Sequence, residues 1–117
     1  MTITISKAQW ASLGERNFER RVAELIRTQY PAQAADVSDA EMRAFTARQA
    51  STARRYGLDD ELSAMTLVLT AFLLGEGYDE RIPALAQVLG APELSAATKA
   101  QALTDFTLAV FGTLEAR

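Results

Sequence analysis

Two short acidic segments are the parts of this sequence whose residue types could do chemistry. Residues 59–61 read Asp-Asp-Glu, and residues 75–80 read Gly-Glu-Gly-Tyr-Asp-Glu. Paired carboxylates can serve as general acid and base, and clustered carboxylates can hold a divalent cation. The first segment, however, is typical of the first turn of a helix, and the second lacks the alternating Asp or Asn ligands of a calcium loop. We therefore expect no catalytic residue, no metal site and no cofactor.

Other residue types that carry out chemistry are scarce. The chain has no histidine and no cysteine, which excludes imidazole bases, thiol nucleophiles, thiolate metal sites and disulfides. Its two lysines, Lys7 and Lys99, fall at the starts of predicted helices, where we expect both to be exposed. The sequence therefore predicts a protein that is not an enzyme.

Length and composition indicate one globular domain over residues 1–117. Apolar residues make up 49% of the sequence and charged residues 23%, an ordinary balance for a folded domain of this size. The first residues show no basic stretch followed by an apolar one. The most apolar stretch, residues 65–74, is shorter than the roughly 20 residues of a membrane-spanning helix. We expect a cytoplasmic protein with no membrane partner.

Five segments combine helical apolar periodicity with signals for a start and an end. The starts are marked by Ser6, Ser38, Asp59 or Asp60, Pro83 and Ser95, and the first four ends by Tyr30-Pro31, Gly57, residues 75–79 and Gly90. Ser6 and Ser38 are each followed at the third position by Gln or Glu, which is capping-box spacing. The third helix, residues 60–74, is apolar nearly all round, as is typical of a central helix. We predict an all-α fold, an irregular bundle of about five helices around this one.

Arginines on the first two helices are the strongest surface feature. On the first helix, Arg20, Glu24 and Arg27 have the spacing of salt bridges along one helix. The arginines of the second helix have fewer acidic neighbours, and arginine and tyrosine are enriched at protein interfaces. A solvated face with weak salt bridges is the alternative interpretation. The candidate partner-binding residues are Arg43, Arg48, Arg54, Arg55 and Tyr56 on this helix, with Tyr78 and Asp79 after it.

Two other functions remain as alternatives. Residues 53–58, with Ala53 four positions before Gly57, have the spacing of a helix-turn-helix, so a nucleic-acid-binding regulator is one. The following helix opens with three acids and has no basic residue before Arg81, so we expect no nucleic-acid partner. Residues 1–58 carry a net charge of +3 and residues 59–117 one of −6, which is compatible with a self-assembling homo-oligomer.

Three short motifs occur in a recognisable order. They are Ile3-Thr4-Ile5-Ser6-Lys7-Ala8-Gln9, then Tyr56-Gly57-Leu58 with Glu61, then Leu74-Gly75 with Tyr78-Asp79 and Pro83. Over residues 3–89 the sequence resembles a group of small helical bacterial proteins encoded beside type VI secretion effector modules, near spike-tip (PAAR-like) and adaptor genes. The resemblance implies a chaperone, adaptor or immunity protein whose partner is an effector toxin or a spike component. It implies no catalytic residue.

Overall fold

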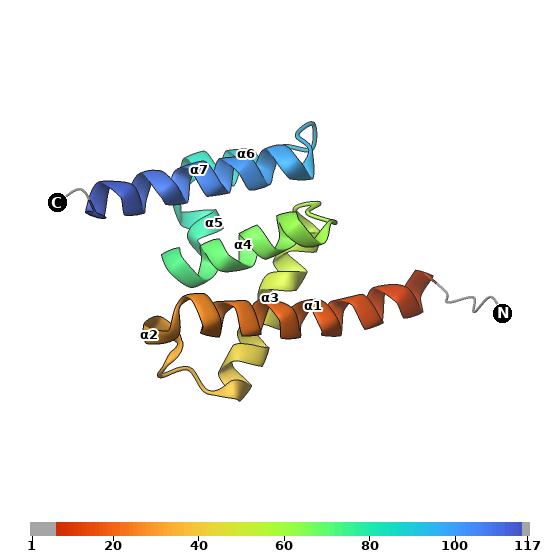
Figure 1. The fold of residues 1–117 in the computed structure, drawn as a ribbon. Helices are drawn as coiled ribbons and strands as arrows, with labels where there is room; N and C mark the ends of the chain where they lie inside the picture. The colour runs from red at the N-terminus through yellow and green to blue at the C-terminus, as the bar shows by residue number, and fades with distance from the viewer. Residues whose placement is uncertain (1–6, 116–117) are drawn as a thin grey trace. The chain divides into compact units, whose positions relative to one another are not determined.

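The fold is all-α, as the sequence predicts. A computed structural model describes the backbone of residues 7–115 and the side chains of residues 17–112, and these residues form seven helices and no strand (Figure 1). The helices are α1 (Lys7–Gln29), α2 (Pro31–Ala34), α3 (Asp39–Arg55), α4 (Glu61–Leu74), α5 (Tyr78–Arg81), α6 (Pro83–Leu89) and α7 (Ala96–Glu115). No described helix is long and apolar enough to cross a membrane. The predicted capping box at Ser6 lies outside the described residues.

The protein divides into two compact units whose boundary falls inside α3. The first unit is Met1–Ala47 and the second is Arg48–Arg117. The first therefore holds α1, α2 and the start of α3, and the second holds the end of α3 with α4 to α7. One domain over residues 1–117, with residues 60–74 at its centre, stays a prediction.

Arg27 fixes the chain reversal of the first unit, in which α2 packs against α1. Its Nη1 donates a hydrogen bond to the carbonyl oxygen of Ala34 (3.2 Å). Its Nη2 donates to the carbonyl oxygen of Val37 (2.9 Å) and forms an ion pair with Asp39 (3.1 Å). The expected pairing of Arg27 with Glu24 is wrong, because three acceptors of the reversal hold this guanidinium.

Local signals set both ends of α3. The hydroxyl of Ser38 accepts a hydrogen bond from the backbone N–H of Glu41 (3.1 Å), so the predicted start is confirmed. At the other end Gly57 has a φ of 80°, and the N–H of Leu58 donates to the carbonyl oxygen of Ala53 (2.9 Å). This is a Schellman motif, in which the left-handed residue is usually glycine. Leu58 and Ala53 are both buried, so the cap also closes an apolar contact.

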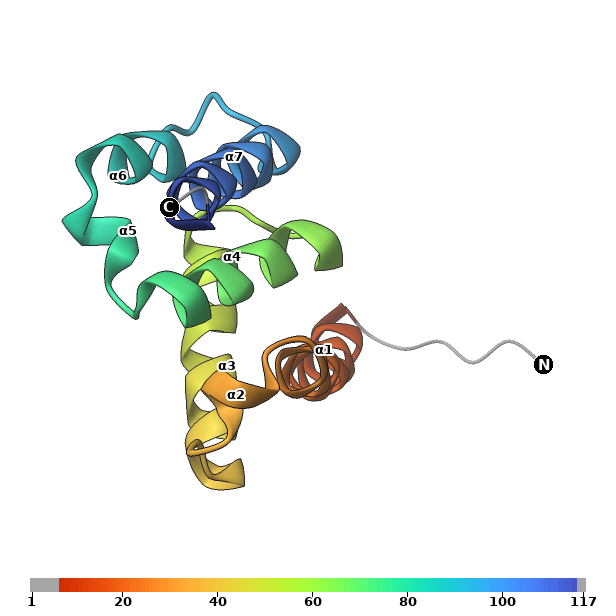
Figure 2. The ribbon, with the colours of Figure 1, turned by 60° about the vertical axis from the view of Figure 1, so that its left-hand side comes forward.

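Helices α4 and α7 form the core of the second unit. They make its most extensive helix pairing, and α7 lies beside α4 in both views (Figures 1 and 2). Asp60 caps α4 by accepting a hydrogen bond from the N–H of Ser63 (2.9 Å), as predicted for this acidic segment. Leu67 and Val68 of α4 and Leu103 of α7 are fully buried. Burial of each contributes about 1.5–3 kcal/mol to stability.

The expected number of helices is too low, because α2 and α5 are single turns. Helix α5 begins within residues 75–79, which the sequence indicates only as the end of the preceding helix. It begins after Gly77, which has a φ of 89° and whose carbonyl oxygen accepts from the N–H of Arg81 (3.0 Å). The predicted starts of α6 at Pro83 and of α7 after Ser95 are confirmed. One turn is too short to show apolar periodicity, so its sequence carries no helical signal.

Candidate protein-binding site

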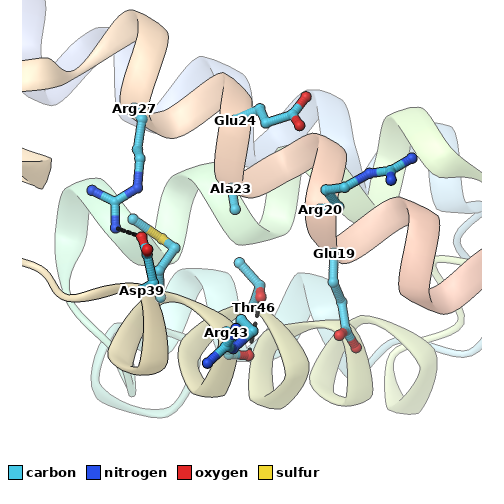
Figure 3. A pocket seen from close by; sticks show the side chains of 9 residues that line it. Glu19, Arg20, Ala23, Glu24, Arg27, Asp39, Arg43 and Thr46 are labelled. Carbon is cyan, nitrogen blue, oxygen red and sulfur yellow. Dashed lines mark hydrogen bonds and ion pairs between the residues drawn. The ribbon is translucent and has the colours of Figure 1, made fainter.

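The first unit has a groove between α1 and the first half of α3 (Figure 3). Its volume is about 570 Å³. Ala23 of α1 and Met42 and Thr46 of α3 lie along its base, and both α3 residues are almost completely buried. The hydroxyl of Thr46 is satisfied within its own helix, because it donates to the carbonyl oxygen of Arg43 (3.1 Å). The base of the groove therefore has no polar side-chain group with an unsatisfied hydrogen bond.

Charged side chains form the rim of this groove. Figure 3 shows Arg27 and Glu19 pointing from α1 toward α3 at opposite ends. Arg27 closes its end by pairing with Asp39. The carboxylate of Glu19 and the guanidinium of Arg43 make no hydrogen bond or ion pair with any described residue. One acidic and one basic group on the rim are thus left for a partner.

The other rim residues of α1 also differ from expectation. Arg20 donates to the side chain of Asn17 (3.4 Å), and the predicted pair of Arg20 with Glu24 does not form. Both side chains are exposed, where such a pair gains little free energy to offset the ordering of two long side chains. Glu24 also lines the groove, but its carboxylate points away from α3 (Figure 3).

In the second unit, Arg48 and Gln49 of α3 bind Glu76 of the segment between α4 and α5. Arg48 makes a two-pronged ion pair, with Nε at 3.0 Å from Oε2 and Nη2 at 2.6 Å from Oε1. The Gln49 amide donates to the same carboxylate (3.1 Å). The hydrogen bond from Arg48 holds the pKa of Glu76 below its ordinary value. These contacts fasten α3 to a loop that lies 27 or 28 residues further along the sequence.

Beyond that contact along α3, a second cluster joins Tyr56 and Arg55 to Asp79 of α5. The Tyr56 hydroxyl donates to Asp79 Oδ2 (2.6 Å), and Arg55 Nη2 lies 3.6 Å from the same oxygen. The Arg55 guanidinium also stacks over the Tyr56 ring at 5.1 Å. Partial burial and the hydrogen bond to Asp79 raise the pKa of Tyr56, which keeps its hydroxyl protonated as a donor.

Tyr78 directly precedes Asp79 in α5 and is fully buried. Its hydroxyl is enclosed and has no hydrogen-bond partner among the described residues. Burial raises the pKa of this phenol far above its ordinary value, so it is neutral at any physiological pH. A ring with no exposed surface contributes volume to the core of the second unit.

The structure thus separates the seven candidate residues into three groups. Arg43 lines the groove of the first unit, with no partner for its guanidinium among the described residues. Arg54 is exposed on α3. The other five, Arg48, Arg55, Tyr56, Tyr78 and Asp79, gather where the end of α3 meets residues 75–81, and all but Tyr78 bind one another or Glu76. Asp79 and Tyr78 are buried, whereas the two arginine side chains stay more than half exposed.

Sequence reasoning missed several residues that shape these sites. Glu76 and Gln49 complete the contact with Arg48, and nothing in the sequence pairs residues so far apart. Lys99 is only 5% exposed, so the expectation of an exposed lysine is wrong. Its ammonium group donates to the carbonyl oxygen of Tyr56 (2.8 Å) at the end of α3, where the helix dipole favours a cation. The Lys7 side chain lies outside the described side chains.

Comparison of the sequence and fold with protein-family models, curated proteins and solved structures finds no match. The resemblance to proteins encoded beside type VI effector modules therefore stays a prediction.

Proposed function

We propose that this protein is a non-catalytic protein-binding accessory factor of a secreted bacterial effector, acting as a chaperone, an adaptor or an immunity protein. The observation that carries the proposal is the groove of the first unit, with its apolar base and two rim charges, Glu19 and Arg43, that pair with no residue the structure describes. The resemblance to type VI-associated proteins supports an effector toxin or a spike component as the partner.

The groove suits an amphipathic helical segment of that partner. Helix-in-groove recognition places apolar side chains of the guest, spaced by three or four residues, against the base of the groove. Here those side chains meet Ala23, which is partly exposed, while an acidic group of the guest meets Arg43 and a basic group meets Glu19. The two rim charges then fix the direction in which the guest lies, because a reversed guest places like charges together.

Co-purification with mutated rim residues tests this proposal. The tagged protein is expressed together with its neighbouring genes, and the recovered partner is identified and its affinity measured by calorimetry. Arg43→Glu and Glu19→Arg each place a like charge against the guest, and each is expected to weaken binding by about tenfold or more. Recovery of no partner, or of one whose affinity neither substitution changes, contradicts the proposal.

Asp36→Arg is the matched control. Asp36 is exposed in the same unit and does not line the groove. Asp36→Arg therefore makes the same change of charge as Glu19→Arg, but at a position outside the proposed binding site. Circular dichroism of all three variants shows whether the helical fold is intact. A loss of binding shared by the control indicates a general charge effect and refutes the groove as the site.

Cell experiments separate the accessory roles. Deletion of the gene reduces secretion or stability of the effector if the protein is a chaperone or an adaptor. The same deletion leaves cells sensitive to the toxin of their siblings if the protein is an immunity protein. In either case the Arg43→Glu gene is expected to reproduce the deletion, because the groove carries the interaction.

The two alternative functions have direct tests on the purified protein. A nucleic-acid-binding regulator must bind random duplex DNA at low salt, since non-specific attraction to phosphate is the least that such a protein shows. A self-assembling protein must show a mass by light scattering that rises with concentration and changes with salt. Either result, with no partner recovered, replaces the proposal.

A further inference from the structure

A pocket in the second unit lies where the end of α3 meets the end of α6 and the first turn of α7. Its volume is about 520 Å³, which is in the range of small-ligand pockets. Lys99 and Arg55 contribute its charged groups, and Pro92 and Leu94 contribute apolar surface. Gly57 lies on its wall, where the absence of a side chain leaves backbone accessible.

Lys99 is the unusual member of this lining. It is 5% exposed, and its ammonium group makes one hydrogen bond, to the carbonyl oxygen of Tyr56. An ammonium group has three N–H donors, so two of them have no acceptor among the described residues. A buried cation is costly unless it is paired and its donors are satisfied, and one backbone carbonyl meets only part of that requirement.

The charge of the lining has one sign. Arg55 stands with Lys99, and no carboxylate of the described residues lines the pocket. Asp79, which pairs with Arg55 at 3.6 Å, lies outside the lining, and Arg55 keeps a side-chain exposure of 60%. Two cations beside apolar surface favour an anion that carries an aliphatic body.

We propose that this pocket binds a carboxylate attached to an aliphatic group. The carboxylate accepts hydrogen bonds from Lys99 and Arg55, and the aliphatic part contacts Pro92 and Leu94. Two sources share this chemistry: a small free carboxylic acid, and the C-terminal residue of a polypeptide. The inference is independent of the groove in the first unit, because the two share no residue.

Titrations followed by NMR of the backbone amides test the pocket. The probes are N-acetyl-leucine, which mimics the C-terminal residue of a polypeptide, 4-methylpentanoate, which is a small acid, and N-acetyl-leucinamide, which has the same body without the charge. Sodium chloride at matching concentration controls for ionic strength. We expect saturable shifts at Gly57, Gly90 and Lys99 with one or both acids in the millimolar range and none with the amide.

The pattern of binding identifies the source. Binding of both acids supports the shared chemistry, binding of N-acetyl-leucine alone supports a polypeptide C-terminus, and binding of 4-methylpentanoate alone supports a small acid. Equal binding of acid and amide, or no saturable shift with any probe, overturns the proposal. This comparison uses the wild-type protein and therefore does not depend on whether a variant folds.

Lys99→Met tests the lysine itself, because methionine keeps much of the apolar stem and removes the charge. Loss of a charge-assisted hydrogen bond is expected to weaken acid binding by about tenfold or more. Arg21→Met is the control, since it removes an exposed positive charge in the other unit and Arg21 lines neither the groove nor this pocket. Acid binding by Lys99→Met within twofold of the wild type would falsify the role of Lys99.

Discussion

Removing the hydroxyl of Tyr56 should lower stability, whereas removing that of Tyr78 should not. The Tyr56 hydroxyl donates to Asp79 at 2.6 Å, and this carboxylate has a side-chain exposure of only 8%. The Tyr78 hydroxyl is enclosed without a hydrogen-bond partner among the described residues. Both phenylalanine substitutions therefore remove one phenol hydroxyl, but only the hydroxyl of Tyr56 makes a hydrogen bond that is lost.

The expected change in the free energy of unfolding follows from the hydrogen bonding of each hydroxyl. A hydrogen bond to a charged acceptor contributes about 1.5–3 kcal/mol. Because Arg55, which lies 3.6 Å from Asp79, can still pair with it in the Tyr56→Phe variant, we expect a loss of about 2 kcal/mol, within that range. At roughly 4 °C per kcal/mol for a protein of this size, Tm falls by about 8 °C. Tyr78→Phe removes a buried polar group without a partner and should leave stability unchanged or raise it by up to about 1 kcal/mol.

Urea unfolding followed by far-UV circular dichroism measures both variants, with thermal unfolding as a second probe. Coincident transitions show that a single free energy of unfolding applies. The double variant Tyr56→Phe, Asp79→Asn is compared with Asp79→Asn alone, since the Tyr56 substitution should cost less stability once the acceptor charge is gone. Equal losses for Tyr56→Phe and Tyr78→Phe would refute the reasoning, because the hydrogen bond would then explain neither.

Three further predictions concern helix ends and one ion pair. Gly57→Ala should lower the free energy of unfolding in urea by about 1 kcal/mol, because a φ of 80° strains any residue with a Cβ. Gly112→Ala should instead raise it by about 0.5–1 kcal/mol, because Gly112 lies within α7 and alanine favours a helix. Asp60→Ala should cost about 1 kcal/mol at pH 7 through loss of the α4 cap. The pKa of Glu76 lies below its ordinary 4.5 because of Arg48, so the pair stabilises above that pH and is lost as pH falls through the lowered pKa. Glu76→Gln should therefore lower the urea midpoint at pH 7 and converge with the wild type in acid; a constant difference at all pH values contradicts the assignment.

The sequence predicts most of the helix boundaries because their signals are local. Ser38, Gly57 and Asp60 act through partners three to five residues away, so their spacing alone indicates each cap. The single turns α2 and α5 escape prediction because four residues cannot show a helical period.

The sites are harder to predict because their partners are distant in sequence. Arg48 meets Glu76 28 residues away, and Lys99 meets Tyr56 43 residues away. The residue types indicate that these arginine and tyrosine side chains form polar contacts. Only the fold shows that the contacts are made with residues of the same protein and not with another protein. Lys99 shows the same limit, since a lysine in a first helical turn is ordinarily solvated.

The burial of Lys99 also makes its amine a reporter of motion. An acylating reagent or a lysine-directed protease needs access to this side chain, which is only 5% exposed and donates to the carbonyl oxygen of Tyr56. Its rate of labelling in the native protein therefore measures how often the Lys99 amine leaves the carbonyl oxygen of Tyr56 and becomes accessible. A ligand that occupies the adjoining pocket should slow that labelling, so mass spectrometry of one amine could follow both opening and occupancy in the intact protein.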